Sequence, residues 1–547
     1  MKNYSKLTFP ELMSESFKSY PDHVALSFVD EKPLTYSDLK NNINSLIFFL
    51  EELGIKKDDK VAILSTNSPN WGVCYLAITF MGAVVVPLLP DFSSEEIKNI
   101  LEHSESKLLF VSDNLTENIE GLKLAHLHTT VSIEDFNVIN SKKDIPVFDI
   151  NAEPQQKYEV EEEDLAAIIY TSGTTGKSKG VMLTHKNICS NAVGACKIQE
   201  ILDTDKFLSI LPLSHTLENT VGFVIPMISG SAVYYLRKLP TPAVLLPALQ
   251  KIKPDIMLSV PLIIEKIYRN KVLPTFQKSR AIKFIYSIAI FRKLLNKVAG
   301  KKLMKTFGGN IRFFGIGGAK LDPTVEKFLL EAKFPYAIGY GLTESSPMIA
   351  GVNPQQTMLG TTGPPMEGVS IKLHNPDKIT GEGEIWAKGP NIMKGYYKDP
   401  VQTREVLTED GWLKTGDLAT LDSNNFVYIK GRCKNVIIGS SGENIYPEDI
   451  ESIINNFKHV AESIVLHQKG KLVAMVHFNK EEIEDKYRHM KEELTHYVEK
   501  KISELEGELQ AYVNSRVSKF SQLQLVVASP DPFQKTATKK IKRFLYT

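Results

Sequence analysis

Short apolar segments alternate with helical segments early in the chain, and this alternation restricts the fold more than any other feature. The pattern predicts helices at 36–53 and 94–103 and strands at 61–64 and 108–111. A helix between two strands returns the chain so that the strands run parallel, with the helix covering one face of the sheet. We therefore expect an α/β fold whose large N-terminal domain holds doubly wound, mainly parallel sheets covered by helices.

The stretch from Tyr170 to Val181 is the most distinctive local sequence. It contains three glycines and two lysines among serine and threonine residues, and it lies between apolar runs at 165–170 and 180–184 that predict strands. Glycine lets backbone N–H groups turn inward, while hydroxyls and lysines donate to phosphate oxygens. This composition predicts a loop that wraps a polyphosphate.

Two other interpretations of this stretch fit the residues less well. A Walker loop, G-x-x-x-x-G-K-[ST], would need glycine where Thr171 stands, and it would open a helix, whereas a strand follows Gly180. A flexible linker rarely carries two lysines between apolar strands. Phosphate binding remains the preferred interpretation.

The composition argues against several classes of protein. The chain has 547 residues, of which 43% are hydrophobic and 24% are charged, as in ordinary globular proteins. A net charge of +1 gives no basic field for nucleic acid, so no nucleic-acid partner is expected. The four cysteines show no C-x-x-C spacing and the histidines no H-E-x-x-H pattern. Neither a disulfide framework nor a zinc site is expected, and a reducing cytoplasm is the default location.

Two segments could be mistaken for membrane signals. Residues 1–13 include Glu11 and have no apolar core, so they do not predict a signal peptide. Residues 71–90 carry no charge and are long enough to span a bilayer, but glycines and prolines interrupt them. We predict a buried helix to about residue 81, followed by a buried strand over 83–89.

Polar or small residues follow several predicted strands. His215 comes after a strand at 207–211, where ligands bind in α/β sheets, although a surface or capping histidine fits equally well. The Gly-Gly-Ala turn at 317–319 leaves room for a flat ring. Residues 340–345, Tyr-Gly-Leu-Thr-Glu-Ser, combine a stacking ring, a phosphate donor and a carboxylate suited to Mg²⁺. Asp417 follows another turn and is suited to grip two ribose hydroxyls.

The pattern changes after Lys434 to that of a small α/β unit. A hairpin is predicted at 464–466 and 472–478, followed by a long charged helical region over 480–517. The tail at 533–543 is strongly basic, which by itself is typical of a solvated charge run.

Taken in order, these segments resemble the AMP-forming acyl-CoA synthetases of the adenylate-forming ligase superfamily over nearly the whole chain. The motifs that carry the resemblance are 171–180, 340–344, 415–417 and 431–432. Each motif is moderately specific alone, and their order makes the resemblance very specific. The stretches 313–320 and 431–451 look most like bacterial long-chain fatty acid–CoA ligases.

The resemblance implies an ATP site, with Thr171 to Lys177 holding the β- and γ-phosphates. The residues implied in ATP or AMP binding are Thr171, Ser172, Gly173, Thr174, Thr175, Gly176, Lys177, Gly317, Gly318, Ala319, Tyr340, Gly341, Asp417 and Arg432. Within this set, residues 317–319 and Tyr340 would enclose adenine. Asp417 would bind the ribose hydroxyls, with support from Arg432.

The resemblance also implies the catalytic groups. Thr343 would contact the α-phosphate, and Glu344 and Thr171 would hold Mg²⁺. His215 would lie by the acyl carboxylate. Lys540 would reach the α-phosphate and the carboxylate during adenylation.

The C-terminal part departs from the family at one point. Related chains often read Thr-Pro-Thr before the catalytic lysine, whereas residues 536–538 read Thr-Ala-Thr, so both Lys539 and Lys540 are candidates. The register of the following residues favours Lys540. The resemblance implies an N-terminal AMP-binding domain over 1–430, a hinge at 431–434 with Lys434 as the hinge residue, and a mobile C-terminal domain over 435–547. Gly442 would line the channel for coenzyme A.

The implied activity is ATP-dependent activation of a long-chain fatty acid, followed by transfer to coenzyme A. ATP, coenzyme A and the fatty acid would be substrates, and Mg²⁺ the cofactor. One alternative is an adenylating enzyme that loads another carboxylic acid or an acyl carrier protein. Another alternative is a non-catalytic nucleotide-binding protein at a membrane surface.

The segment 271–305 predicts contact with a membrane. It contains ten lysine and arginine residues and no aspartate or glutamate. Its apolar residues Phe284, Ile288, Phe291, Leu295 and Val298 fall on one helical stripe, as in a helix lying in lipid headgroups. The alternative is a helix packed on the sheet with a solvated basic face. The expected location is therefore cytoplasmic, with peripheral contact at the inner face of a membrane.

Overall fold

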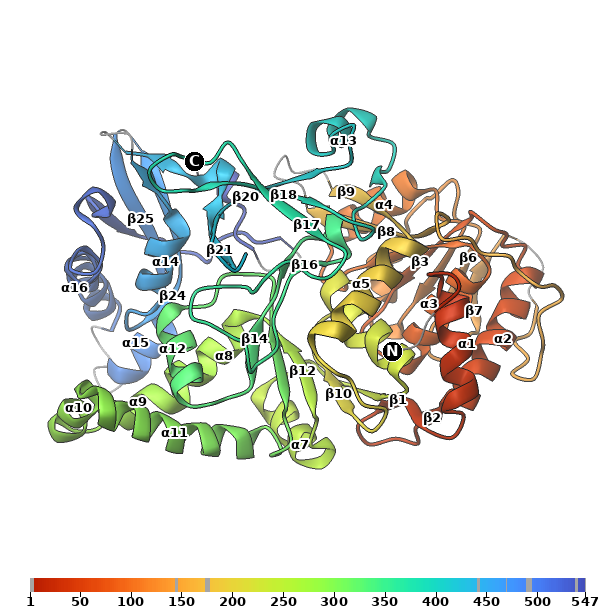
Figure 1. The fold of residues 1–547 in the computed structure, drawn as a ribbon, viewed down its shortest axis with the longest axis horizontal. Helices are drawn as coiled ribbons and strands as arrows, with labels where there is room; N and C mark the ends of the chain where they lie inside the picture. The colour runs from red at the N-terminus through yellow and green to blue at the C-terminus, as the bar shows by residue number, and fades with distance from the viewer. Residues whose placement is uncertain are drawn as a thin grey trace.

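The computed structural model in Figure 1 describes residues 4–142, 146–172, 178–439, 443–468, 470–487, 494–536 and 540–546. Two large sheets with their helices form the N-terminal part of the chain, from red to green in Figure 1. The C-terminal part, in blue, is a smaller α/β unit beside them. The predicted α/β class with parallel sheets is confirmed.

The first sheet carries the predicted phosphate loop. Its strand order is β19-β9-β8-β4-β3-β5-β6-β7. The strands are β3 (Lys60–Leu64), β4 (Val84–Leu88), β5 (Leu108–Val111), β6 (Thr129–Ser132), β7 (Val138–Ser141), β8 (Leu165–Ser172), β9 (Ser178–Thr184) and β19 (Gly395–Tyr396). The centre is parallel, as predicted, whereas the β6–β7, β8–β9 and β9–β19 pairs are antiparallel.

The second sheet is parallel except at β1–β2, and its order is β14-β13-β12-β10-β11-β1-β2. Its strands are β1 (Val24–Phe28), β2 (Leu34–Thr35), β10 (Lys206–Ser209), β11 (Ala232–Tyr235), β12 (Ile256–Ser259), β13 (Phe313–Ile316) and β14 (Tyr336–Ile338). The strand predicted at 207–211 is present as β10, with ends that differ by one and two residues.

Helices connect and cover these strands. They are α1 (Phe9–Ser19), α2 (Tyr36–Glu52), α3 (Pro69–Phe80), α4 (Ser94–Ser104), α5 (His185–Ile198), α6 (Ile225–Ser229), α7 (Pro242–Ile252), α8 (Pro261–Ile267), α9 (Leu273–Gln277), α10 (Arg280–Ser287), α11 (Ala289–Thr306), α12 (Pro323–Glu331) and α13 (Pro400–Val406). Thr35 with Asp38 starts α2, and Ser93 with Glu96 starts α4, each through a reciprocal capping box. Such a cap satisfies two backbone donors that a helix start leaves free.

The uncharged run at 71–90 belongs to the core. Residues 71–79 of α3 and all of β4 are buried, so the prediction of a buried helix and strand is confirmed. Trp71 and Tyr75 stack with ring centroids 5.2 Å apart, and Phe223 meets both rings edge-on. Among the described residues, no helix has both the length and the apolar character needed to cross a membrane.

An antiparallel sheet joins the N-terminal part to the C-terminal unit. Its order is β17-β18-β20-β21, and its strands are β17 (Ser370–His374), β18 (Gly383–Lys388), β20 (Leu413–Leu421) and β21 (Val427–Arg432). A short antiparallel pair, β15 (Tyr340–Gly341) and β16 (Met348–Ala350), precedes it. Alternation with helices does not predict such a sheet, because its strands follow one another directly.

The C-terminal unit has its own buried apolar cluster, which runs from Ile445 to Val526. Its elements are β22 (Ile437–Ile438), β23 (Asn444–Ile445), α14 (Pro447–Asn455), β24 (Val460–Gln468), β25 (Lys471–Phe478), α15 (Lys480–Tyr487), α16 (Leu494–Asn514) and β26 (Leu525–Ala528). The predicted hairpin is β24–β25, and the predicted helical region contains both α15 and α16.

Candidate functional site

The predicted phosphate loop joins the two strands of a hairpin. Strands β8 and β9 are antiparallel, with Thr171 opposite Lys179 and Ser172 opposite Ser178. A Walker loop runs from a strand into a helix, so this geometry differs from it, as the sequence predicted. Of the predicted phosphate contacts, residues 173–177 lie outside the described part of the chain. Their contacts with phosphate remain a prediction.

Tyr396 connects this hairpin to Glu344. On β19, Tyr396 pairs with Val181 of β9, and Lys179 lies over its ring with Nζ 5.1 Å from the centroid. The Tyr396 hydroxyl donates to Glu344 Oε1 at 2.9 Å. The Glu344 carboxylate is therefore held by the strand that pairs with β9 of the hairpin. Sequence reasoning missed Tyr396, although an aromatic residue two positions from Lys394 in a Gly-Tyr-Tyr run was a visible signal.

Thr343 and Glu344 lie in a tight turn between β15 and β16. Two buried asparagines hold this turn, since Asn191 Nδ2 and Asn391 Nδ2 each donate to the carbonyls of Ser345, at 3.0 Å, and of Met348, at 2.8 Å. Neither asparagine was predicted from the sequence. They make the position of Glu344 depend on α5 and on the loop after β18.

Gly341 has a packing role in the same turn. A Cβ built on Gly341 would come within 1.8 Å of the Pro347 carbonyl oxygen, so only glycine fits between β15 and β16. The close approach of the backbone at Pro347 therefore accounts for glycine at this position of the predicted nucleotide site. Thr343 Oγ1 lies 3.5 Å from Thr216 Oγ1, which connects the turn to the segment that holds His215.

Asp417 is the centre of a second polar group. It lies on β20 opposite Arg432 of β21, with Arg432 Nε 2.9 Å from Asp417 Oδ1. The Tyr340 hydroxyl donates to Asp417 Oδ2 at 2.7 Å. Asp417 is 5% exposed, and burial raises its pKa, which the Arg432 guanidinium opposes. The structure thus brings together three residues that the sequence placed in one nucleotide site.

The Gly-Gly-Ala turn follows β13 and faces the His215 segment. A Cβ on Gly317 would lie 3.1 Å from Leu217 Cδ2, and Gly318 has a φ of +84° in the left-handed region. The turn therefore favours glycine at Gly318 for its backbone and at Gly317 for close approach. Gly318 and Ala319 are exposed.

His215 follows β10 and its ring orientation is fixed. Its Nδ1 accepts a hydrogen bond from the Leu217 backbone N–H at 3.3 Å, which leaves the hydrogen on Nε2. Burial lowers the pKa of His215 to about 4, and the charge of Lys540 lowers it further in the same direction. At neutral pH this side chain is an uncharged hydrogen-bond donor.

Lys540, from the C-terminal tail, lies within electrostatic range of His215. Lys540 is exposed as a whole residue, but desolvation at its amine lowers the amine's pKa and the Arg432 charge adds to this, while Asp417 and Glu344 oppose it. The amine therefore lies within electrostatic range of all three residues and of His215. Lys540 sits at a turn where its backbone N–H donates to Thr536 Oγ1 at 3.2 Å. Lys539 lies outside the described residues.

Polar contacts dock the C-terminal unit against the N-terminal part. Lys320 pairs with Asp449 at 2.5 Å, and Ser452 donates to Asp322 at 2.9 Å. Asn456 also donates to Asp322. Lys434, the predicted hinge, is exposed in the turn Cys433–Asn435 between β21 and β22. Gly442, predicted to line the coenzyme A channel, lies outside the described residues.

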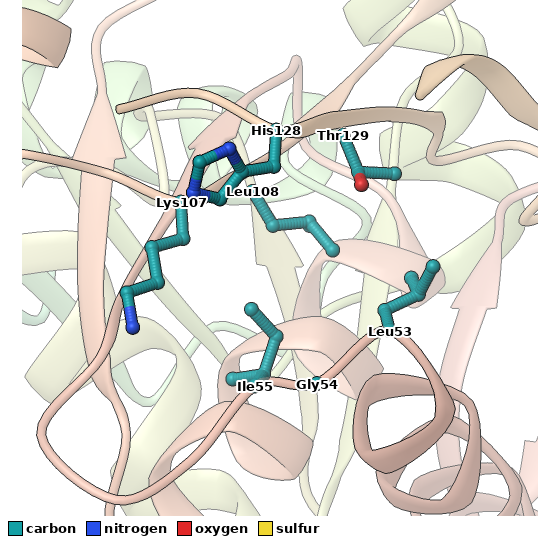
Figure 2. A pocket seen from close by; sticks show the side chains of 7 residues that line it. All are labelled: Leu53, Gly54, Ile55, Lys107, Leu108, His128 and Thr129. Carbon is teal, nitrogen blue, oxygen red and sulfur yellow. The ribbon is translucent and has the colours of Figure 1, made fainter. Parts of the chain in front are cut away.

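A small pocket lies apart from this site. Figure 2 shows it near the starts of β5 and β6, lined by Leu53, Ile55, Lys107 and His128 among others. It encloses about 80 Å³. None of the site residues predicted from the sequence lines this pocket.

The chain belongs to the AMP-binding enzyme family, whose pattern matches residues 13–397. Fatty acyl-CoA synthetase A of Dictyostelium discoideum is 28% identical over 78% of this chain and 68% of its own length. Long chain acyl-CoA synthetase 6, peroxisomal, of Arabidopsis thaliana is 29% identical over 82% of this chain and 68% of its own. The chloroplastic long-chain-fatty-acid–acyl-carrier-protein ligase AEE15 of the same plant is 28% identical over 86% and 76%.

These relatives are eukaryotic, whereas the sequence resemblance pointed to bacterial ligases. Two of them are named as peroxisomal or chloroplastic, so the predicted cytoplasmic location is not one that they share.

Solved structures share the fold. The o-succinylbenzoate CoA synthetase of Bacillus subtilis, in complex with its acyl-adenylate, superposes with a TM-score of 0.75 at 23% identity over 98% of both chains. ATP-bound MatB of Rhodopseudomonas palustris gives a TM-score of 0.73 at 22% identity over 98% of this chain and 97% of its own. At this identity the likeness shows the fold alone.

Proposed function

We propose that this chain is a long-chain fatty acid–CoA ligase that forms an acyl-adenylate from ATP and transfers the acyl group to coenzyme A. The observation that carries the proposal is a pair of fixed carboxylates, Asp417 held by Arg432 and Tyr340 and Glu344 held by Tyr396. The Lys540 amine, from the C-terminal tail, lies within electrostatic range of both. Names of relatives as long-chain acyl-CoA synthetases support the substrate class.

The nucleotide would lie between the Glu344–Tyr396 pair and the group formed by Asp417, Arg432 and Tyr340. Asp417, braced by Arg432 and Tyr340, offers carboxylate oxygens to the ribose hydroxyls. The turn at 317–319 and the Tyr340 ring would enclose adenine, while residues 171–177 would contact the β- and γ-phosphates. Thr343 would contact the α-phosphate from the turn that the two asparagines hold.

Glu344 and Thr171 supply hard oxygen donors of the kind that Mg²⁺ prefers, and Glu344 is oriented by Tyr396. Bound there, Mg²⁺ would neutralise charge on the phosphates. The domain boundaries proposed are 1–430, a hinge at 431–434 and 435–547, consistent with the separate apolar cluster after Ile445.

In the first step a carboxylate oxygen of the fatty acid attacks the α-phosphorus, and pyrophosphate leaves. The lysine at position 540 places its positive charge between the two anions as they approach. The neutral His215 donates from Nε2, so it orients the carboxylate without adding a charge. This arrangement needs the C-terminal unit docked as it is here.

In the second step the thiolate of coenzyme A attacks the acyl carbon and expels AMP, with the thiol proton passing to solvent or a nearby base. The first step must exclude water, while the second must admit a thiol. Rotation of the C-terminal unit about Lys434 would meet both needs, withdrawing Lys540 and bringing Gly442 to the channel.

The acyl preference follows from the segment after His215. A π-helical stretch, Glu218–Val224, and helix α6 are buried and apolar apart from a few polar residues, and contain no lysine or arginine. Without a cation to pair with a polar tail, a hydrocarbon chain is favoured, and each buried CH₂ contributes about 0.8 kcal/mol.

The test is pyrophosphate release with acetate, octanoate, laurate, palmitate and benzoate. Rates at limiting acid should rise with chain length through palmitate. Faster turnover of acetate or benzoate than of laurate and palmitate would contradict the proposed substrate class.

One alternative acceptor has specific support, because the Arabidopsis relative AEE15 is named as an acyl-carrier-protein ligase. Thioester formation with coenzyme A alone distinguishes the two. Product with coenzyme A supports the proposal, whereas product only with a carrier protein would replace the acceptor and leave the adenylation step intact.

A further inference from the structure

Helices α10 and α11 form a long arm along the lower left edge of the molecule in Figure 1. The sequence predicted one continuous apolar stripe here, but the helix is interrupted at Ile288, between α10 and α11. Leu295, predicted on that stripe, instead packs partly buried against the neighbouring core. The other four stripe residues, Phe284, Ile288, Phe291 and Val298, are exposed.

Polar contacts fix the face of α11 that packs on the protein, beside apolar residues such as Leu295 and Leu303. Arg292 binds Glu331 of α12 through two nitrogens, at 2.9 and 3.1 Å, and Asn296 Nδ2 donates to the same carboxylate at 2.8 Å. A Cβ on Gly300 would come within 2.3 Å of the Ala332 carbonyl oxygen. These contacts set the rotation of α11 about its axis, so its outer face cannot turn inward.

The outer face carries a row of exposed apolar side chains among its lysines. Ile290 is 78% exposed, Leu294 59% and Val298 61%, and on α10 Phe284 is 69% exposed. Scattered exposed apolar residues are ordinary, but a contiguous row on one arm marks an interaction surface.

The same arm is strongly basic. The cations of residues 271–305 are Lys271, Lys278, Arg280, Lys283, Arg292, Lys293, Lys297, Lys301, Lys302 and Lys305. Except for Arg292, all are exposed and none forms an ion pair with a described acid. With no acid in the segment, the nine exposed charges are not neutralised from within it.

We propose that α10 and α11 dock the protein on the surface of an anionic lipid bilayer, with the exposed apolar residues entering the headgroup layer. A bilayer surface matches both properties, because it accepts apolar side chains and carries the opposite charge. The lysine stems can lie along the apolar row while their amines reach the phosphates. This inference stands independently of the proposed function, since it concerns binding and not catalysis.

Co-sedimentation with vesicles tests it, using phosphatidylcholine alone and phosphatidylcholine with phosphatidylglycerol, each at low and high salt. Binding should require the anionic lipid and weaken with salt. Lys293→Gln/Lys297→Gln should weaken the partition about 30-fold, since each charge near the surface contributes about a factor of five. Ile290→Ser/Leu294→Ser should weaken it at least about tenfold. Lys32→Gln/Lys40→Gln, an equal charge change at distant exposed sites, should leave it unchanged.

A second measurement reports insertion directly. Leu294→Trp should be quenched by brominated lipids in anionic vesicles, and Ile139→Trp, at an exposed site on β7, should not. Equal binding to both vesicle types, no binding, or variants that bind like the parent would each overturn the proposal. Self-association through this arm without vesicles, abolished by Ile290→Ser/Leu294→Ser, would assign the surface to a second copy instead.

Discussion

Tyr396 donates its hydroxyl hydrogen to the Glu344 carboxylate at 2.9 Å, across 52 positions of sequence. Tyr396 is also paired with β9 of the phosphate hairpin. The carboxylate expected to hold Mg²⁺ is therefore positioned by the strand beside the loop expected to hold the phosphates. A side chain that orients a metal ligand commonly matters to the metal's affinity.

Replacing Tyr396 with phenylalanine removes this hydrogen bond and keeps the ring. A hydrogen bond to a charged group contributes about 1.5–3 kcal/mol, so we expect adenylation to slow about tenfold or more and to need more Mg²⁺. Pyrophosphate release measured against Mg²⁺ concentration gives both values. Tyr397→Phe is the matched control, since its ring packs on His103 instead. If Tyr396→Phe has the parent's rate and Mg²⁺ dependence, the orienting role is wrong.

The division of labour between the half-reactions can be tested at Lys540. Its amine shares a site with Asp417 and Glu344 in this docked arrangement, so Lys540→Ala should reduce adenylation about 100-fold or more. Transfer from a synthetic acyl-adenylate to coenzyme A should change less than about threefold, because rotation withdraws the side chain.

Lys539→Ala is the control for register and should behave like the parent in both assays. A Lys540→Ala variant that adenylates normally would refute the assignment. If Lys539→Ala alone is inactive, the catalytic lysine is one residue earlier.

The elements near the site were largely predictable, but their mutual contacts were not. Apolar runs and their periodicity predicted α2, α4 and the central strands, because those signals are local. Asp417 and Glu344 were also identified from local motifs and resemblance. Asn191 and Asn391 were not, because each acts only through a turn that the fold brings to it. The break at Ile288 was likewise missed, since helical periodicity continues across it.

The docked arrangement itself can be weakened without touching the nucleotide site. Ser452→Ala/Asn456→Ala removes two hydrogen bonds to Asp322, yet leaves Asp322 to start α12 through the Thr324 and Val325 N–H groups. Each hydrogen bond to a carboxylate contributes about 1.5–3 kcal/mol. Because Ser452 and Asn456 are only half-buried, the net loss is smaller.

We expect adenylation by Ser452→Ala/Asn456→Ala to fall about threefold to tenfold, while thioester formation from acyl-adenylate is unchanged or faster. Stopped-flow measurement of each half-reaction decides this. An equal loss in both half-reactions would indicate general damage to the C-terminal unit, and no loss in either would show that these contacts do not control docking.

Glu218 is a buried carboxyl group at the start of the proposed acyl segment. It is 1% exposed, and its Oε2 has no hydrogen-bond partner among the described residues. Gly222 leaves room for it, since a Cβ there would lie 2.7 Å from the carboxyl carbon. Burial raises the pKa of Glu218 to about 8, partly offset by a hydrogen bond from Ser209. At neutral pH the group is mainly uncharged.

This raised pKa makes the folded state less stable at high pH. The unfolded chain releases the Glu218 proton near pH 4.5, whereas the folded chain keeps it to about pH 8. Stability from this group is therefore full below pH 4.5, falls between pH 4.5 and 8, and is constant above. Each pH unit in that window contributes about 1.4 kcal/mol, so the loss reaches a few kcal/mol.

Glu218→Gln keeps the shape and cannot ionise, so it should escape this loss. We expect the thermal midpoint of Glu218→Gln to rise relative to the parent as pH increases from 5 to 8. Differences between the two chains cancel the other groups that titrate in this range. Glu95→Gln, at an exposed site on α4, should follow the parent at every pH. A constant gap between Glu218→Gln and the parent would show that Glu218 is already ionised in the folded protein at pH 5.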